Sequence, residues 1–186
     1  METILALDQQ LLLALNFPGG NFLDSFFFMV SGKLIWLPLY LFIACLLVIH
    51  LGWRKALIAL VCMGLMVVAV DHVANFFKSY TPKFRPSRNP ALAPFVHTVN
   101  GYKGGLYGTV SAHAAISFTI AFTSLSLIRN KIYTILILVW ALLVSYSRIY
   151  LGVHFPLDIF FGISSGCLFS FLALKLYYLT TKRLKL

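Results

Sequence analysis

The chain has 186 residues, of which 60% are hydrophobic and 11% are charged. A mean hydropathy of +0.89 excludes a soluble globular domain, and the length allows one membrane-embedded domain but not two. The formal net charge is +10, and the basic residues are scattered between hydrophobic runs. This distribution favours two explanations for the charge, retention of loops in the cytoplasm and attraction to an anionic lipid or substrate. It argues against nucleic acid as a partner.

The N-terminal region, residues 1–31, contains two short apolar segments. Residues 2–16 carry polar side chains on one side, which predicts a helix lying in the membrane interface. Residues 22–31 have the length of a half-helix and would add a span only if they crossed the bilayer.

Five longer apolar runs follow, each close to the roughly 20 residues that a spanning helix needs. They are residues 33–51, 55–77, 112–128, 131–150 and 157–179. The sequence therefore predicts an all-α fold, a polytopic membrane helical bundle in which residues 1–186 form a single domain. We expect five spanning helices, or six if residues 22–31 also cross, together with the N-terminal interfacial helix. Gly162 and Gly166 form a GxxxG pattern in the last run. Such a pattern is found where helices dimerise and where helices pack closely within one bundle, and we favour close packing inside the bundle.

The charges between the runs suggest an orientation. If the spans alternate, three basic connections fall on one face, which the positive-inside tendency makes cytoplasmic: Arg54 with Lys55, Arg129 with Lys131, and Lys182, Arg183 and Lys185 in the tail. The opposite face receives the long polar loop 79–110. That face also carries cations, namely Lys78, Lys83, Arg85, Arg88, Lys103 and Arg148. The orientation therefore agrees with the positive-inside tendency only if these cations have a separate function.

Three polar clusters meet on this second face. The first is KSYTPKFRP, in which Lys78 ends one span and Arg85 follows it. The second is VSAHA, where Ser111 stands at an N-cap position and His113 lies in the first turn of the next helix, among free amide groups that can bind an anion. Taken alone, the first pattern is typical of interfacial anchors and the second of an ordinary capped helix.

The third cluster, SRIYLGVHFPLDIF, joins the last two runs. Arg148 ends one of them and Pro156 suits the first position of the next helix, so His154 lies just before that helix and Asp158 in its first turn. This spacing lets the carboxylate hold one imidazole nitrogen and leave the other free, as a nucleophilic or basic histidine requires. A capped helix with an Arg–Asp pair is the alternative explanation for this cluster alone.

Together the clusters supply cations, histidines and two helix N-termini, which suits phosphoryl transfer to or from a multiply charged oxyanion. A lipid-phosphate binding or transport protein could use the same cationic pocket, but it would not need His154 placed before Asp158. A metallohydrolase built on His113, His154 and Asp158 is disfavoured because the nearby cations would repel a divalent metal. We therefore expect neither a metal nor a cofactor.

The motifs KxxxxxxRP from Lys78 to Pro86, SxH from Ser111 to His113, and SRxxxxxHxxxD from Ser147 to Asp158 resemble those of the type 2 phosphatidic acid phosphatase (PAP2) superfamily. The resemblance covers about residues 71–162. It implies a metal-independent membrane phosphatase that forms a phosphohistidine intermediate.

Carried over by position, the resemblance implies that His154 is the nucleophile, Asp158 orients it, and His113 is the general acid. The residues that it assigns to the substrate phosphate are Lys78, Arg85, Ser111, Ala112 and Arg148. Val110 and Ala112 stand where the family usually has proline and glycine, and the methyl group of Ala112 narrows the approach of the backbone to the phosphate.

The sequence thus predicts an integral-membrane phosphatase for a lipid-linked phosphate monoester or diphosphate. Undecaprenyl diphosphate, phosphatidylglycerophosphate, phosphatidic acid and lipid A phosphates all fit, because the shape of loop 79–110 does not follow from the sequence. The expected partners are this lipid and the bilayer, and the oligomeric state stays open. In a bacterium, we expect the protein in the inner membrane, with the active site on the periplasmic face and the C-terminus in the cytoplasm.

Overall fold

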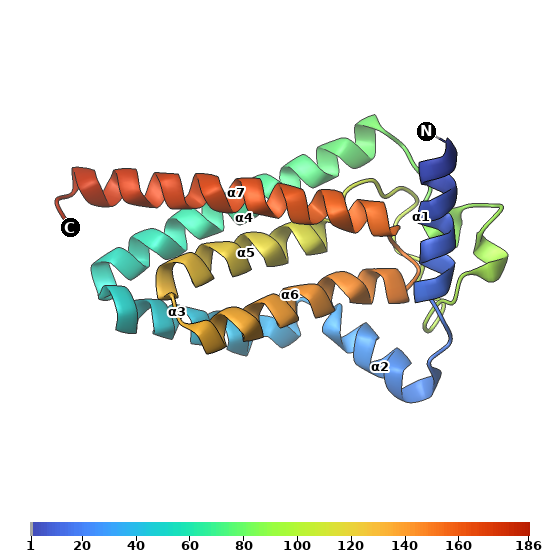
Figure 1. The fold of residues 1–186 in the computed structure, drawn as a ribbon, viewed down its shortest axis with the longest axis horizontal. Coiled ribbons are helices and arrows are strands. Elements are labelled where there is room, and N and C mark those ends of the chain that lie inside the picture. Colours follow the sequence, from blue (N-terminus) through green and yellow to red (C-terminus); the bar gives the residue numbers. More distant parts are fainter. Residues whose placement is uncertain (1) are drawn as a thin grey trace.

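The computed structural model describes residues 2–186, and its regular elements are helices. In chain order these are α1 (Glu2–Leu15), α2 (Gly20–Val30), η1 (Leu34–Trp36), α3 (Leu37–Leu51), α4 (Trp53–Tyr80), η2 (Pro86–Arg88), η3 (Ala93–Phe95), α5 (Ala112–Ile128), α6 (Lys131–Tyr150) and α7 (Pro156–Arg183). Helices α3 to α7 run along the long axis, while α1 lies across one end of the bundle (Figure 1). The predicted all-α class is confirmed.

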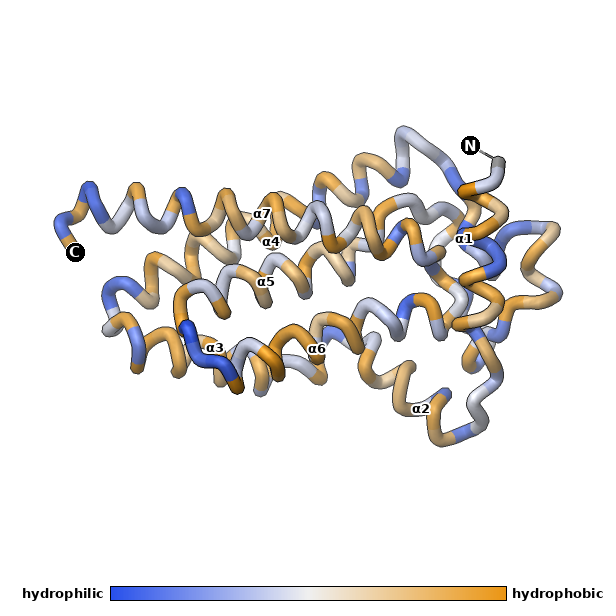
Figure 2. The backbone as a smooth tube through the Cα atoms, viewed as in Figure 1, coloured by the Kyte–Doolittle hydropathy of each residue, from blue (hydrophilic) through white to orange (hydrophobic). Residues whose placement is uncertain are grey.

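Within residues 2–186, four helical stretches are long and apolar enough to cross a membrane: Leu34–Leu51, Trp53–Tyr80, Lys131–Tyr150 and Pro156–Arg183. Each of them corresponds to a predicted run. The fifth predicted run is α5, a shorter apolar helix of 17 residues. The count of five or six spans therefore stays a prediction, as does the interfacial position of α1. Figure 2 shows hydrophobic residues along the middle of the bundle and hydrophilic residues gathered toward its ends.

Helix α5 lies at the centre of the bundle and packs against α4, α6 and α7. Its contact with α7 depends on two glycines, because a Cβ atom at Gly162 would lie 2.7 Å from the carbonyl oxygen of Ser111, and one at Gly166 would lie 2.8 Å from that of Ala115. The interpretation of this GxxxG pattern as close packing inside the bundle is confirmed.

Loop 79–110 is fixed against the turn between α6 and α7 by backbone hydrogen bonds. The amide of Ser87 donates to the carbonyl of Gly152 at 3.0 Å, and within the loop the amide of Gly108 donates to the carbonyl of Lys83 at 2.9 Å. The loop and α1 therefore close the end of the bundle opposite the C-terminus (Figure 1). Because α4 ends, α5 begins and α6 meets α7 at this end, the three polar clusters are close in space.

Candidate active site

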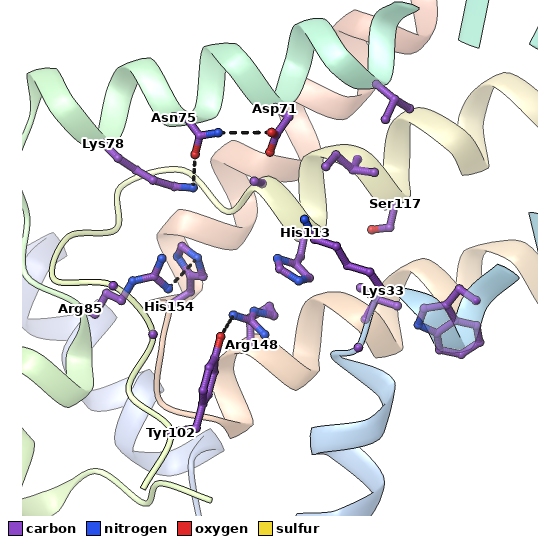
Figure 3. Close-up of a pocket in the computed structure, with 18 of the residues that line it drawn as sticks. Lys33, Asp71, Asn75, Lys78, Arg85, Tyr102, His113, Ser117, Arg148 and His154 are labelled. Atoms are coloured by element: carbon purple, nitrogen blue, oxygen red, sulfur yellow. Dashed lines mark hydrogen bonds between the residues drawn. The ribbon is translucent and has the colours of Figure 1, made fainter. Parts of the chain in front are cut away.

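A cavity of about 500 Å³ opens at the loop end of the bundle. Residues from all three sequence clusters line it, and they are Lys78, Arg85, Ala112, His113, Arg148 and His154. Figure 3 shows that side chains from α4, the loop, α5, α6 and the α6–α7 turn converge on this space. The two remaining predicted residues, Ser111 and Asp158, are buried behind the cavity wall.

His154 and Asp158 form the pair that their spacing predicts. Nδ1 of His154 lies 3.2 Å from Oδ2 of Asp158, and the same oxygen accepts a hydrogen bond from the backbone amide of Phe155 at 3.0 Å. Pro156 opens α7, which places Asp158 in its first turn. When Nδ1 donates to Asp158, Nε2 keeps its lone pair on the side of Arg85, whose Nη1 lies 3.4 Å away.

The charge state of His154 follows from its surroundings. Its side chain is 2% exposed, and burial, followed by the charges of Arg85 and Arg148, holds its pKa well below the usual value. The imidazole is therefore neutral at neutral pH. A neutral imidazole with an oriented ring has the form that attacks an electrophile.

Two arginines are fixed around this ring by contacts that leave part of each guanidinium free. Arg85 donates from Nε to the carbonyl of Tyr107 at 3.1 Å and from Nη1 to that of Val153 at 3.0 Å. Arg148 contacts the hydroxyl of Ser31 and lies 3.2 Å from that of Tyr102. Its buried Nε has no hydrogen-bond partner among residues 2–186. Such pre-positioned donors suit phosphate oxygens.

Lys78 extends from the last turn of α4 and donates to Oδ1 of Asn75 at 3.0 Å. Asn75 in turn donates from Nδ2 to Oδ2 of Asp71 at 3.2 Å. Asp71 thus contacts Lys78 through Asn75, a residue that sequence reasoning missed. Asn75 lies four residues after Asp71 and three before Lys78, so the three side chains share one face of α4. This spacing is the local signal that could have identified Asn75.

The start of α5 has the predicted cap. Oγ of Ser111 accepts from the amide of Ala114 at 3.3 Å, while the amide of Ser111 donates to the carbonyl of Asp158 at 3.0 Å. Ser111 is fully buried, and its assignment to the substrate phosphate stays a prediction. Ala112 and the half-buried His113 face the cavity instead. Figure 3 shows His113 and His154 on opposite sides of the space above Arg148.

Lys33 is another residue that sequence reasoning missed. It precedes η1 and extends into the cavity beside His113 (Figure 3). In the sequence it has the ordinary pattern of a lysine at the start of a span. The tertiary fold brings the segment before η1 close to the start of α5, and this places the charge of Lys33 near the site.

The cavity wall away from the loop is largely apolar and comes mainly from α3 to α6. Its members are Trp36, Tyr40, Val67, Ile116, Trp140 and Val144. Tyr40, Val67 and Ile116 also line a neighbouring cavity of about 290 Å³ between α3, α4 and α5. A cationic end and an apolar end in one space suit an amphipathic molecule with an anionic head.

Comparison with known proteins gives several matches. Residues 55–182 match the profile of the PAP2 superfamily. The chain is 36% identical to a lipid A 4′-phosphatase of Porphyromonas gingivalis, over 98% of the chain and 78% of that protein. It is 38% identical to a lipid A 4′-phosphatase of Bacteroides thetaiotaomicron, over 95% of the chain and 81% of that protein. An undecaprenyl-diphosphatase of Sulfolobus acidocaldarius is 33% identical over 84% of the chain and 70% of that protein.

Two solved structures share the fold. A transmembrane PAP2-type phosphatidylglycerolphosphate phosphatase from Bacillus subtilis gives a TM-score of 0.67 at 21% identity, covering 94% of the chain and 86% of that protein. LpxE from Aquifex aeolicus gives a TM-score of 0.65 at 27% identity, covering 89% of the chain and 93% of that protein.

Proposed function

The chain belongs to the PAP2 superfamily of membrane phosphatases, and on this premise we propose that it removes the 4′-phosphate from lipid A or a close relative of lipid A. The observation that carries this choice is the similarity to two lipid A 4′-phosphatases along almost the whole chain, including α1 and α2, which lie outside the family match. Undecaprenyl diphosphate is the second candidate, because one relative is named for that activity.

The proposed reaction begins with His154. Nε2 attacks phosphorus, the bond between phosphorus and the lipid oxygen breaks, and His113 gives its proton to the departing oxygen. Lys78, Arg85 and Arg148 hold the phosphate oxygens, so charge is stabilised without rearrangement during the step. The lipid alcohol leaves and the phosphate stays bound to His154.

Water completes the cycle. His113, now neutral, takes a proton from a water molecule whose oxygen attacks phosphorus, and the bond to Nε2 of His154 breaks. Inorganic phosphate leaves, and both histidines return to their starting states. Asp158 orients the ring throughout from the Nδ1 side, at 3.2 Å.

Two structural features support turnover of a lipid over mere binding of one. A protein that only binds phosphate needs cations but has no use for a buried imidazole oriented by a carboxylate, which is present at His154. The apolar part of the cavity gives the lipid portion a place next to the reacting phosphate.

We propose further that the site faces the extracytoplasmic side of a bacterial inner membrane. The basic connections at residues 54–55 and 129–131 and the C-terminal tail lie at the end of the bundle opposite α1 and loop 79–110 (Figure 1). The positive-inside tendency places that end in the cytoplasm. Loop 79–110 would then be extracytoplasmic, and a cysteine introduced at Asn89 should react with an impermeant thiol reagent in intact cells.

The test of function is phosphate release in detergent from a panel of lipids, with and without EDTA. The panel contains lipid A, undecaprenyl diphosphate, phosphatidylglycerophosphate and phosphatidic acid. We expect lipid A to be the best substrate and EDTA to have no effect. Preference for another lipid would overturn the substrate, whereas binding without release from any of the four would favour a binding protein.

A further inference from the structure

The carboxylate of Asp158 is held from two sides. Oδ2 contacts the imidazole of His154 and the amide of Phe155, while Oδ1 accepts a hydrogen bond from Nζ of Lys83 at 3.0 Å. Lys83 comes from the loop after α4 and is not among the residues lining the phosphate cavity. Its charge therefore acts on the orienting carboxylate from the side away from the substrate.

Lys83 has a second carboxylate partner, supplied by α1. Oδ2 of Asp8 lies 3.5 Å from Nζ of Lys83, and Oδ1 of Asp8 accepts from the amide of Leu157 at 2.9 Å. Asp8 thus contacts both the lysine and the first turn of α7, which carries Asp158. The family match begins at residue 55, so Asp8 lies outside it. Through Lys83, Asp8 is nevertheless connected to Asp158, the partner of His154.

The charges in this cluster depend on one another. Both carboxylates have side chains 2% exposed, while that of Lys83 is 32% exposed. The ammonium also lies 4.1 Å from the ring centre of Phe155, which restricts where the lysine can point. Removing the lysine would leave two buried carboxylates near one another without this cation, and such carboxylates move or take up a proton.

We propose that Lys83 and Asp8 are positioning residues of this phosphatase: Lys83 holds Asp158 so that Oδ2 stays on Nδ1 of His154, and Asp8 holds Lys83. The inference rests on the proposed function of His154 as the nucleophile. It makes α1 part of the apparatus that orients the reacting imidazole.

A purely structural role, in which Lys83 only anchors α1, predicts different kinetics. Because neither Lys83 nor Asp8 lines the phosphate cavity, a positioning role lowers kcat and the rate of phosphoenzyme formation and leaves KM close to that of the wild type. An anchoring role instead lowers the thermal midpoint and the amount of active protein, while the molecules that stay folded keep the wild-type kcat.

The experiment uses the full chain in detergent with lipid A as substrate, or with whichever panel lipid proves best. The variants are Lys83→Met, which keeps much of the apolar stem, Lys83→Arg, which keeps the charge, Asp8→Asn, and Lys83→Met combined with Asp8→Asn. Lys103→Met is the matched control, because it removes an exposed lysine of the same loop that does not line the cavity. The measurements are kcat, KM, thermal midpoint, and single-turnover labelling of the protein with phosphate.

We expect Lys83→Met to lower kcat by roughly 10-fold to 100-fold, the size of effect typical of outer partners of catalytic groups in metal sites. Lys83→Arg should recover most of the loss, and Lys103→Met should match the wild type. If Asp8 acts through Lys83, the double variant should be no worse than Lys83→Met. Losses that multiply in the double variant would remove Asp8 from the proposal.

Two other outcomes would overturn the inference about Lys83. One is Lys83→Met at wild-type kcat per folded molecule, and the other is a loss that Lys83→Arg does not recover. The proposed role of His154 as the nucleophile fails separately, if the wild-type protein releases phosphate without a phosphate label ever appearing on His154. In that case the inference falls with it, whereas a labelled wild type combined with an unaffected Lys83→Met overturns the inference alone.

Discussion

Two histidine–aspartate pairs lie at the same end of this molecule, and only one of them faces the cavity. Nδ1 of His154 lies 3.2 Å from Asp158, and Nε2 of His97 lies 2.9 Å from Asp24. The shorter contact is therefore the one outside the cavity. The presence of a pair, or its distance, does not distinguish a reactive imidazole from a structural one.

The surroundings of the two pairs do distinguish them. Both side chains of the His154 pair are 2% exposed, and Nη1 of Arg85 lies 3.4 Å from Nε2 of the ring. The side chains of the His97 pair are 19% and 23% exposed, and Asp24 also accepts from the hydroxyl of Tyr150 at 2.5 Å. That second pair connects α2 to loop 79–110 and to the last turn of α6. The His154 pair is therefore surrounded by cations and borders the cavity, as a reactive imidazole requires. The His97 pair instead joins three parts of the fold, as a structural contact does.

The largest expected effect belongs to His154→Ala. Every substrate requires the nucleophile, so turnover should fall by at least about 10⁴-fold whatever group leaves, and no phosphate label should appear on the protein. Single-turnover labelling followed by gel analysis measures this directly, with His97→Ala as the matched control. Phosphate label retained on His154→Ala would remove His154 as the nucleophile.

Asp158→Asn should come next. The variant keeps the shape of the side chain but removes the charge that orients Nδ1, and comparable changes in a serine protease triad cost about 10⁴-fold in kcat. Asp24→Asn provides the comparison and should leave kcat near the wild-type value. Equal kcat losses in both variants would mean that the two pairs do not differ in function.

His113→Ala should cost about 10²–10⁴-fold on an alkyl phosphate, the usual value of general acid catalysis. An aryl phosphate has a leaving group that needs the proton less, so the loss in phosphoenzyme formation should be smaller there. The rate of phosphoenzyme formation must be followed, because the proposed mechanism also has His113 activate water in the second step. Equal losses on both leaving groups would assign His113 to phosphate binding instead.

The pH dependence of kcat/KM, which reports the ionisable groups of the free enzyme, should be bell-shaped. The pKa of His154 is held below its usual value of about 6.5, so the neutral nucleophile persists as the pH falls to that value and is lost only below it. The acidic limb due to His154 should therefore lie below about pH 6.5, and the alkaline limb should reflect loss of the acid's proton. A flat profile from about pH 5 to 9, with chemistry rate-limiting, would contradict two histidines in these roles.

The smallest effect on activity should come from His97→Ala. The loss of a partly exposed hydrogen bond should lower the unfolding free energy by about 1 kcal/mol, and hence the thermal midpoint by about 2–4 °C. Phosphate release per folded molecule should match the wild type. A marked fall in kcat without loss of stability would show that the second pair also takes part in the reaction.

The sequence predicted the elements and residues whose signals are local. Long apolar runs indicated the helices, and the separation of His154 from Asp158 indicated their contact, because both signals act within one or two helical turns. The position of α5 at the centre was also detectable in principle, since its many alanine, serine and threonine residues are typical of close helix contacts.

Contacts between distant parts of the chain could not be predicted in this way. Lys83 and Asp158 are separated by 75 residues, and Asp8 and Leu157 by 149. Nothing in the local pattern around Lys83 separates it from Lys103, the other lysine of the loop. The loop could be recognised as polar, but its path across the α6–α7 turn depends on tertiary hydrogen bonds. The outer partners of Asp158 were therefore missed although Asp158 itself was found.

The hydrogen bond from the amide of Ser111 to the carbonyl of Asp158, at 3.0 Å, joins the starts of α5 and α7 main chain to main chain. The helix that carries His113, the proposed acid, and the helix that carries Asp158, the proposed partner of the nucleophile, are thus connected by atoms that every amino acid except proline possesses. Changes of side chain on the apolar wall of the cavity, such as those in α3, leave this main-chain connection intact. Side-chain changes on that wall can therefore alter which lipid fits the cavity without disturbing the connection between α5 and α7.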